Sequence, residues 1–206
     1  MTLLALTNPS SHLFWITSRA AGTASLVLAS MSVTVGLMIG GKLMQGRGRG
    51  GDLRALHEAL ALGALAALAL HGISLLGDPY LHPGVAGIAI PFAGRYRPLW
   101  TGLGIVGGWG LAVLGLSYYA RDKFGADRWR ALHRFTVLFW ALGVIHSIGS
   151  GTDARARWYL IVLVLLVVPP LVMLPARLAS GDRRRAERRQ PRPRPGSATG
   201  ANSLAR

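Results

Sequence analysis

The chain has 206 residues, is 51% hydrophobic and carries a formal net charge of +15. Five of its apolar stretches are long enough to span a membrane, and little polar sequence is left over for a separate soluble domain. It contains no cysteine, which excludes disulfides, thiolate ligands and Cys-ligated iron–sulfur clusters. Any metal chemistry must therefore use histidine, methionine or carboxylate.

In chain order, the apolar pattern predicts helices at 18–41, 53–77, 98–120, 128–150 and 156–178. The fifth contains Pro169, Pro170 and Pro175, which should kink or end it near the membrane face. The start of the chain lacks the basic region of a signal peptide, so we expect the first helix to be retained. The predicted fold class is an all-α membrane protein, a bundle of about five transmembrane helices in which two ligand-bearing helices run parallel. Its predicted parts are an outer segment 1–17, a helical domain 18–178 and a disordered basic tail 179–206.

Lysine and arginine are divided unevenly between the two ends of these helices. One end carries many of them, in segments 42–54 and 120–130 and in the tail after Arg177. The other end carries only Arg19, Arg95, Arg97, Arg155 and Arg157. The positive-inside rule then predicts an external N-terminus and a cytoplasmic C-terminus. Because the positive charge is explained by the membrane topology, we expect contact with anionic lipid and no nucleic-acid partner. The excess of Ala, Leu, Gly and Arg indicates a bacterial source, so we expect the protein in a bacterial cell membrane.

Four histidines occur in two copies of one pattern. Arg54-Ala55-Leu56-His57 is followed by His71, and Arg130-Ala131-Leu132-His133 by His146, at separations of fourteen and thirteen residues. At about 1.5 Å rise per residue these separations are about 20 Å, most of a bilayer core of about 30 Å. Histidine is costly in hydrocarbon, so four of them at matched depths indicate a function.

The predicted topology places His57 and His133 at one depth near the cytoplasm, and His71 and His146 at another near the outside. Two facing imidazoles are the ligand set of a six-coordinate heme b iron, so we predict an inner and an outer heme at these pairs. Fourteen residues leave two side chains about 40° apart around a helix, whereas thirteen leave them about 140° apart. We therefore expect a bend near Gly143, or different rotamers, in the second helix.

Packing between helices is the alternative role for these histidines. A lone histidine in a membrane helix is more often a packing residue bonded to a neighbouring carbonyl, but two matched pairs favour ligation. His12 and His82 lie in outer segments without a partner and are interpreted as surface residues. No HExxH, CxxC, GxSxG or P-loop motif is present, so hydrolase and NTPase functions have no residues to support them.

Arginines and glycines near the histidines are further candidates. Arg54, Arg130 and Arg134 lie beside the inner pair, where heme propionates need cations, although Arg54 and Arg130 would also suit membrane-edge anchoring. The proline-rich segment 78–98 predicts an ordered cap over the outer heme, from which Arg95 and Arg97 would meet propionates or an anionic acceptor. Glycines four residues apart predict close approach of a helix or a porphyrin face at two places, Gly36/Gly40 and Gly104/Gly108.

These residues together resemble the ferric reductase-like transmembrane domain, the heme module of ferric reductases, NADPH oxidases and the heme subunit of a bacterial methionine sulfoxide reductase system. The resemblance covers about residues 15–178 and is carried by His57/His71, His133/His146 and Ser18-Arg19-Ala20-Ala21-Gly22. It implies hemes at the two histidine pairs and, from the oxidase branch, a place for Arg19 beside the outer heme.

The chain also departs from that family in two ways. The oxidase branch has a further histidine one turn beyond the position of His71, where this chain has Leu75, so superoxide production is not expected. Many members have six helices and a fused flavin- and NADPH-binding domain. This chain has no matching stretch, so its electrons should come from elsewhere.

The predicted function is a transmembrane cytochrome b with two b hemes, the electron-transfer component of an oxidoreductase. It would take electrons from a separate flavoprotein reductase or a quinol and pass them to an outer acceptor such as ferric iron. Bis-histidine ligation leaves no vacant iron position, so the acceptor should be reduced at the outer edge, near Arg19, Arg95 and Arg97. Two alternatives remain: a single-heme or quinone-linked subunit of a separate periplasmic reductase, and a heme-free membrane packing or assembly protein.

Overall fold

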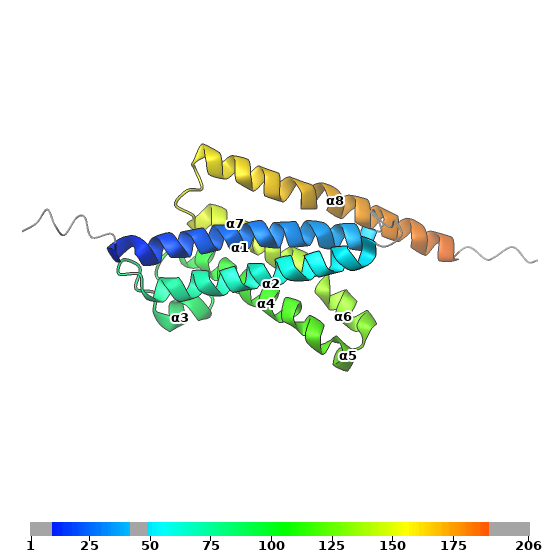
Figure 1. Cartoon of the computed structure of the whole chain (residues 1–206), viewed down its shortest axis with the longest axis horizontal. Coiled ribbons are helices and arrows are strands. Elements are labelled where there is room, and N and C mark those ends of the chain that lie inside the picture. The colour runs from blue at the N-terminus through cyan, green and yellow to red at the C-terminus, as the bar shows by residue number, and fades with distance from the viewer. Residues whose placement is uncertain (1–9, 42–48, 190–206) are drawn as a thin grey trace, which may run out of the picture.

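The structure is a computed structural model that describes residues 10–41 and 49–189, and within these ranges it is helical without strands (Figure 1). The elements are α1 (Ser10–Gly41), α2 (Arg49–Leu76), α3 (Gly84–Ala89), α4 (Pro98–Leu116), the 3-10 turn η2 (Ser117–Ala120), α5 (Arg121–Phe124), α6 (Ala126–His133), α7 (Thr136–Ser150) and α8 (Arg157–Arg189). Five stretches are long and apolar enough to cross a membrane: His12–Gly41, Gly50–Leu76, Pro98–Lys123, Ala126–Ser150 and Arg157–Pro175. The prediction of an all-helical chain with about five possible spans is thus confirmed.

The first and last helices are longer than predicted. α1 begins at Ser10 because Leu13, Phe14 and Ile16 extend its apolar pattern, so part of the expected outer segment 1–17 is helical. α8 continues through its three prolines to Arg189, past the expected start of the tail at 179. Its end is rich in Arg and Ala, which are strong helix formers. The loop 42–48 and the rest of the predicted tail, 190–206, lie outside the described residues.

The bundle is arranged around α1. This helix packs along α2 and also contacts α7 and α8, while α4 packs along α7. In Figure 1, α2 and α7 run in the same direction, opposite to α1, α4 and α8. The core between α1, α2, α7 and α8 contains Ala29, Ala64, Trp140, Val144, Tyr159 and Leu163. The two histidine-bearing helices are therefore parallel, as the sequence predicted.

Large apolar side chains cover the outer surface of the bundle. Ile73, Val113 and Leu165 are 63%, 63% and 67% exposed, and many other leucines, valines and isoleucines resemble them. Soluble monomers rarely expose so much contiguous apolar surface. The five apolar helices are therefore compatible with an integral membrane protein.

A row of serines sets the register between α1 and α2. Ser18, Ser25 and Ser32, spaced seven residues apart, donate from Oγ to the backbone carbonyls of His71 (3.1 Å), Ala64 (2.9 Å) and His57 (3.3 Å). A seven-residue period drifts by only about 20° per step, so all three hydroxyls stay on one face. Small side chains also let the two helices approach closely. This serine row holds both histidines of α2 against α1.

The helix that carries His133 and His146 is interrupted between them. The break falls at Arg134 and Phe135, between α6 and α7, where the amide of Phe135 donates to the carbonyl of Leu132 at 3.0 Å in a tightened turn. Gly143, where a bend was expected, lies inside the continuous helix α7. The interruption in this helix therefore lies close to His133 and not at Gly143, and the alternative of different rotamers for the two rings stays a prediction.

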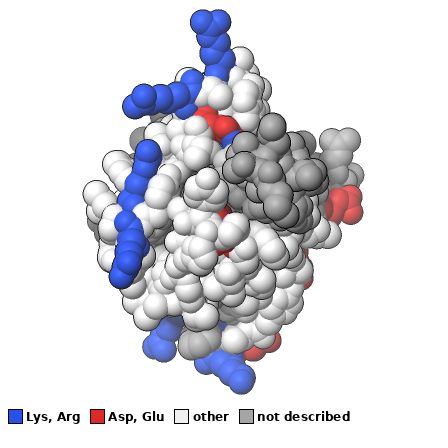
Figure 2. Space-filling model, turned by 90° about the vertical axis from the view of Figure 1, so that its left-hand side faces the viewer, with Lys and Arg blue, Asp and Glu red and all other residues white. Residues whose placement is uncertain are grey.

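The segment between α2 and α4 is folded and attached to the neighbouring helices. Trp109 donates from Nε1 to the carbonyl of Ala89 at 2.9 Å. Arg97 donates to the carbonyl of Gly149 at 2.5 Å, and the hydroxyl of Tyr96 donates to the carbonyl of Ser150 at 3.3 Å. Seen from this end, the molecule is mostly uncharged, with Lys and Arg side chains toward its edges (Figure 2). The segment is thus attached to α4 and α7, and its place as a cap over an outer heme stays a prediction.

Candidate functional site

The four histidines of the sequence pattern meet as two pairs. The ring centroids of His57 and His133 lie 6.1 Å apart, and those of His71 and His146 lie 6.4 Å apart. Each pair joins α2 to the broken helix α6–α7, and the pairs lie at the two depths that the spacing predicted. Although His133 and His146 are thirteen positions apart, both therefore face α2, one on each side of the α6–α7 interruption.

The spacing within each pair suits a metal ion between two imidazoles. Two metal–nitrogen bonds of about 2 Å, with about 1 Å more from each nitrogen to its ring centre, give a centroid separation of about 6 Å. Within the described ranges, no group of three or more His, Asp or Glu side chains is placed to hold a metal. Two imidazoles are the number that a six-coordinate heme iron takes from the protein, because the porphyrin supplies the other ligands.

Hydrogen bonds from α1 fix the tautomer of both histidines on α2. The Nδ1 atoms of His71 and His57 lie 2.8 Å and 2.9 Å from the backbone carbonyls of Ser18 and Ser32. A carbonyl can only accept, so each Nδ1 carries the proton and donates it. The Nε2 lone pair is then left for a metal, as in most histidine ligands, whose other nitrogen is held by an outer partner.

The histidines on the opposite side are held by α4 and by a tryptophan. Nδ1 of His146 donates to the carbonyl of Trp100 at 2.9 Å, in the first turn of α4. The ring of His133 stacks on Trp129 with centroids 4.7 Å apart and planes at 25°. Trp129 is itself anchored, since its Nε1 donates to the hydroxyl of Ser117 at 3.1 Å. Three histidines therefore share one mode of orientation, and His133 is positioned by stacking.

Glycines make room for three of the imidazole rings. A Cβ atom on Gly104 would lie 2.5 Å from the His146 ring, one on Gly22 would lie 2.9 Å from His71 Nδ1, and one on Gly36 would lie 3.1 Å from His57 Cε1. Each glycine follows the carbonyl that accepts the Nδ1 proton by four residues, which is one helical turn. The predicted close approach at Gly36 and Gly104 is thus made to a histidine ring. At Gly108 the nearest neighbour is Leu68, at 3.4 Å.

The arginines predicted beside the His57–His133 pair lie at the same end of the bundle as that pair. Arg54 precedes His57 by one turn of α2, and Arg134 follows His133 at the start of the α6–α7 break. Arg130 pairs with Asp127 at 2.5 Å. All three side chains are exposed at this end, where they are accessible to an anionic group.

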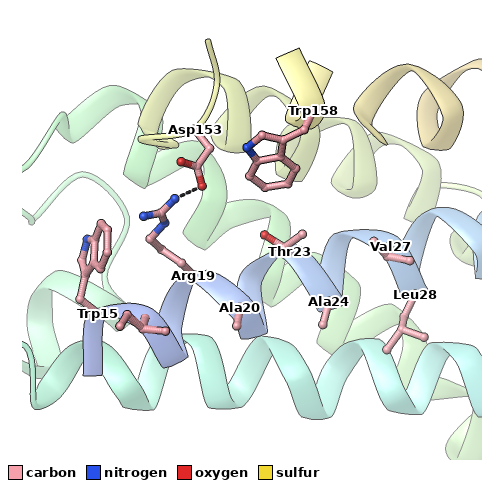
Figure 3. A pocket seen from close by; sticks show the side chains of 10 residues that line it. Trp15, Arg19, Ala20, Thr23, Ala24, Val27, Leu28, Asp153 and Trp158 are labelled. Atoms are coloured by element: carbon pink, nitrogen blue, oxygen red, sulfur yellow. Dashed lines mark ion pairs between the residues drawn. The ribbon is translucent and has the colours of Figure 1, made fainter. Parts of the chain in front are cut away.

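The arginines predicted on the outer side divide into two groups. Arg95 and Arg97 lie exposed in the segment before α4, and Arg97 is bonded to the end of α7. Arg19 forms an ion pair with Asp153, from the loop before α8, and its guanidinium lies 4.1 Å from the ring centroid of Trp15 (Figure 3). Because neighbouring residues differ by about 100° around a helix, Ser18 faces His71 while Arg19 faces α8. The structure thus places Arg19 in a groove between α1 and α8.

Sequence reasoning found the histidines and missed what orients them. The missed signal was Ser-x-x-x-Gly, which occurs at Ser18/Gly22 and at Ser32/Gly36 with the same fourteen-residue separation as His57 and His71. No pattern indicated the pairing of Arg19 with Asp153. His12 and His82 are exposed, as predicted.

The resemblance to the ferric reductase-like transmembrane domain was predicted from the histidine spacing and the start of the first helix, and it stays a prediction. Comparison of the chain with protein-family models, with curated proteins and with solved structures gives no match.

Proposed function

We propose that this protein is an integral membrane cytochrome b that moves electrons between the two sides of a membrane through two b hemes. The observation that carries the proposal is that four imidazoles meet two by two, at two levels of the bundle. Ring centroids lie 6.1 Å apart in one pair and 6.4 Å apart in the other. The Nδ1–H···O=C bonds of His57, His71 and His146 support it, because they direct the basic Nε2 atoms away from the protein backbone.

Each group around the histidines has a role in this proposal. His57 and His133 hold the inner heme, His71 and His146 hold the outer one, and the bound hemes supply one-electron chemistry. The carbonyls of Ser18, Ser32 and Trp100 fix the orientations of the ligating rings. Cations for the propionates come from two sets of arginines, the inner Arg54, Arg130 and Arg134 and the outer Arg95 and Arg97.

The two levels are far enough apart to carry charge across a bilayer. Fourteen residues of α2 separate His57 from His71, which is about 20 Å of a core about 30 Å thick. With the N-terminus outside, electrons enter at the His57–His133 level from a cytoplasmic flavoprotein or a quinol. They leave from the His71–His146 level to an acceptor at the outer surface, such as ferric iron.

A reduced-minus-oxidised visible spectrum of the purified chain, with heme quantified on the same sample, tests this function. We expect the bands of low-spin b heme and about two hemes per chain. A value of about one would favour the single-heme alternative, in which the chain serves a separate periplasmic reductase. A colourless protein would overturn the proposal in favour of a heme-free packing or assembly role, in which the imidazoles only join helices.

The orientation gives a second expected result. Reporter fusions after Lys42, Lys123 and Arg183 should report a cytoplasmic location, because the basic segments remain inside. A fusion between Pro79 and Arg97 should report an external one. The measurement is paired phosphatase and fluorescent-protein activity in intact cells. An external signal from the fusion after Arg183 would exchange the inner and outer hemes and contradict the proposed direction of transfer.

The source of electrons gives a third expected result. No glycine-rich dinucleotide fingerprint follows a strand pattern in the sequence, so NADPH with free flavin should reduce the purified protein slowly. Addition of a flavin reductase or a reduced quinol should give rapid heme reduction, followed as growth of the reduced absorption band. Rapid reduction by NADPH in the absence of a second protein would contradict this expectation.

A further inference from the structure

A groove lies between α1 and α8 at the end of the bundle that carries the outer histidine pair. Its volume is about 690 Å³, within the range of about 300–1,000 Å³ that is typical of small-molecule sites. Arg19 and Asp153 lie at its end beside Trp15 and Trp158, and Ala24 lies farther along α1 (Figure 3). The groove is thus polar and aromatic at one end and apolar along its length.

The charged groups in the groove suit a neutral ligand. Arg19 and Asp153 form an ion pair, and their side chains are 33% and 30% exposed. The pair has no net charge, so it offers little net attraction to an anion such as phosphate. A neutral group with carbonyl or hydroxyl oxygens would instead use guanidinium N–H donors and carboxylate acceptors.

The shape suits a flat head group on an apolar tail. Trp15 and Trp158 present aromatic rings at the same end as the ion pair, where indole side chains gather at a membrane–water boundary. From there Ala20, Ala24 and Val27 line the groove along α1, over about 10 Å at the rise of a helix. A planar polar ring would lie among the indoles, and its tail would follow the small side chains.

The groove is close to the outer histidine pair. Ser18, whose carbonyl holds His71 Nδ1 at 2.8 Å, is the chain neighbour of Arg19. The groove and the outer pair therefore lie on different faces of the same turn of α1, separated by about one helix diameter, on the order of 10 Å.

From these features we propose that the groove binds the head group of a lipid-soluble quinone, which exchanges electrons with the outer heme level. The electron exchange, though not the binding, rests on the function proposed above. Arg19 donates hydrogen bonds to a quinone carbonyl oxygen, and Asp153 exchanges protons with the outer aqueous phase. Two electrons from the His71–His146 level and two protons through Asp153 convert the two carbonyls of the quinone to hydroxyls. The cytoplasmic donor supplies these two electrons through the two heme levels and is itself oxidised.

Binding can be measured without heme, through quenching of tryptophan fluorescence by decylubiquinone, with the full chain in phosphatidylcholine nanodiscs. Arg19→Gln removes the guanidinium, and Ala24→Phe fills the groove. The matched controls are Arg155→Gln, in the same loop as Asp153, and Ala66→Phe, exposed on α2. We expect each groove variant to weaken binding about tenfold or more, the value of one hydrogen bond to a charged group, and each control to bind as the unaltered chain does.

Three outcomes would overturn the quinone site: equal affinities in all four variants, no quenching by decylubiquinone, or displacement of the quinone by an equal concentration of decanol. Displacement by decanol would show a site for any alkyl chain.

Heme quantified in the same preparation separates the quinone proposal from the proposal of a cytochrome b. Saturable, Arg19-dependent quinone binding to a heme-free chain would support the site while refuting the cytochrome. With heme present, quinol formation that is lost in Arg19→Gln and retained in Arg155→Gln would support both proposals.

Discussion

Replacement of His57 or His133 by alanine is expected to remove the inner heme and leave about one heme per chain, because an iron that loses one of its two protein ligands is held far less tightly. Replacement of His71 or His146 should remove the outer heme in the same way. The partners in each pair lie 6.1 Å and 6.4 Å apart by ring centroid, so the two variants of one pair should share one phenotype. Heme quantification and redox titration of the four purified variants measure the effect.

Two histidines outside the pairs provide matched controls. His12 and His82 are exposed, so His12→Ala and His82→Ala should retain both hemes and both midpoint potentials. The heme that remains in each ligand variant shows that the bundle is still folded. Unchanged heme content in all four ligand variants would defeat the assignment, and loss of both hemes from every variant would show that the two levels do not bind independently.

Gly104→Ala is expected to disrupt the outer heme with a single methyl group. The added Cβ would lie 2.5 Å from Cγ and Nδ1 of His146, closer than non-bonded atoms can pack, so the ring must move away from His71. Overpacking of this kind costs about 1–3 kcal/mol. Because this free energy is spent in moving the His146 ring, we expect the affinity for the outer heme to drop about tenfold or more. The inner heme should be unaffected.

The matched control lies one turn farther along the same helix. A Cβ on Gly108 would meet Leu68 at 3.4 Å, an ordinary contact, so Gly108→Ala should bind both hemes normally. Heme titration of the two apo-proteins compares them directly. Equal affinities for Gly104→Ala and Gly108→Ala would show that the outer heme does not depend on the position of the His146 ring.

The helices and the histidine pairs could be predicted because both follow from local rules. Long apolar runs give the number of spans, and residue spacing gives depth through the constant rise of a helix. The position of the α6–α7 break could not be predicted. It falls at Arg134 and Phe135, where no proline or glycine marks it. The glycine that was expected to bend, Gly143, lies in an unbroken helix.

Residue spacing alone could not predict which neighbours the site residues contact. Ser18 and Arg19 are adjacent, yet one bonds to His71 and the other to Asp153. Which neighbour each of them meets depends on the rotation of α1 and on the position of α8, and neither is encoded locally. The length of α8 was underestimated for another reason: a basic, polar composition was read as disorder, although Arg and Ala also favour helix.

The serine row between α1 and α2 would restrict how the distance between the two proposed hemes can change. Ser18, Ser25 and Ser32 repeat every seven residues against His71, Ala64 and His57. An insertion into both helices would keep each histidine facing its carbonyl only if it adds nearly whole turns, as a step of seven residues, about 10 Å long, does. An insertion of one or two residues would turn a histidine away from its carbonyl. Because electron tunnelling falls off steeply with distance, the rate of transfer between the proposed hemes would depend on the fourteen residues of α2 between His57 and His71. The helix that holds these two histidines in place, α1, would contribute no ligand.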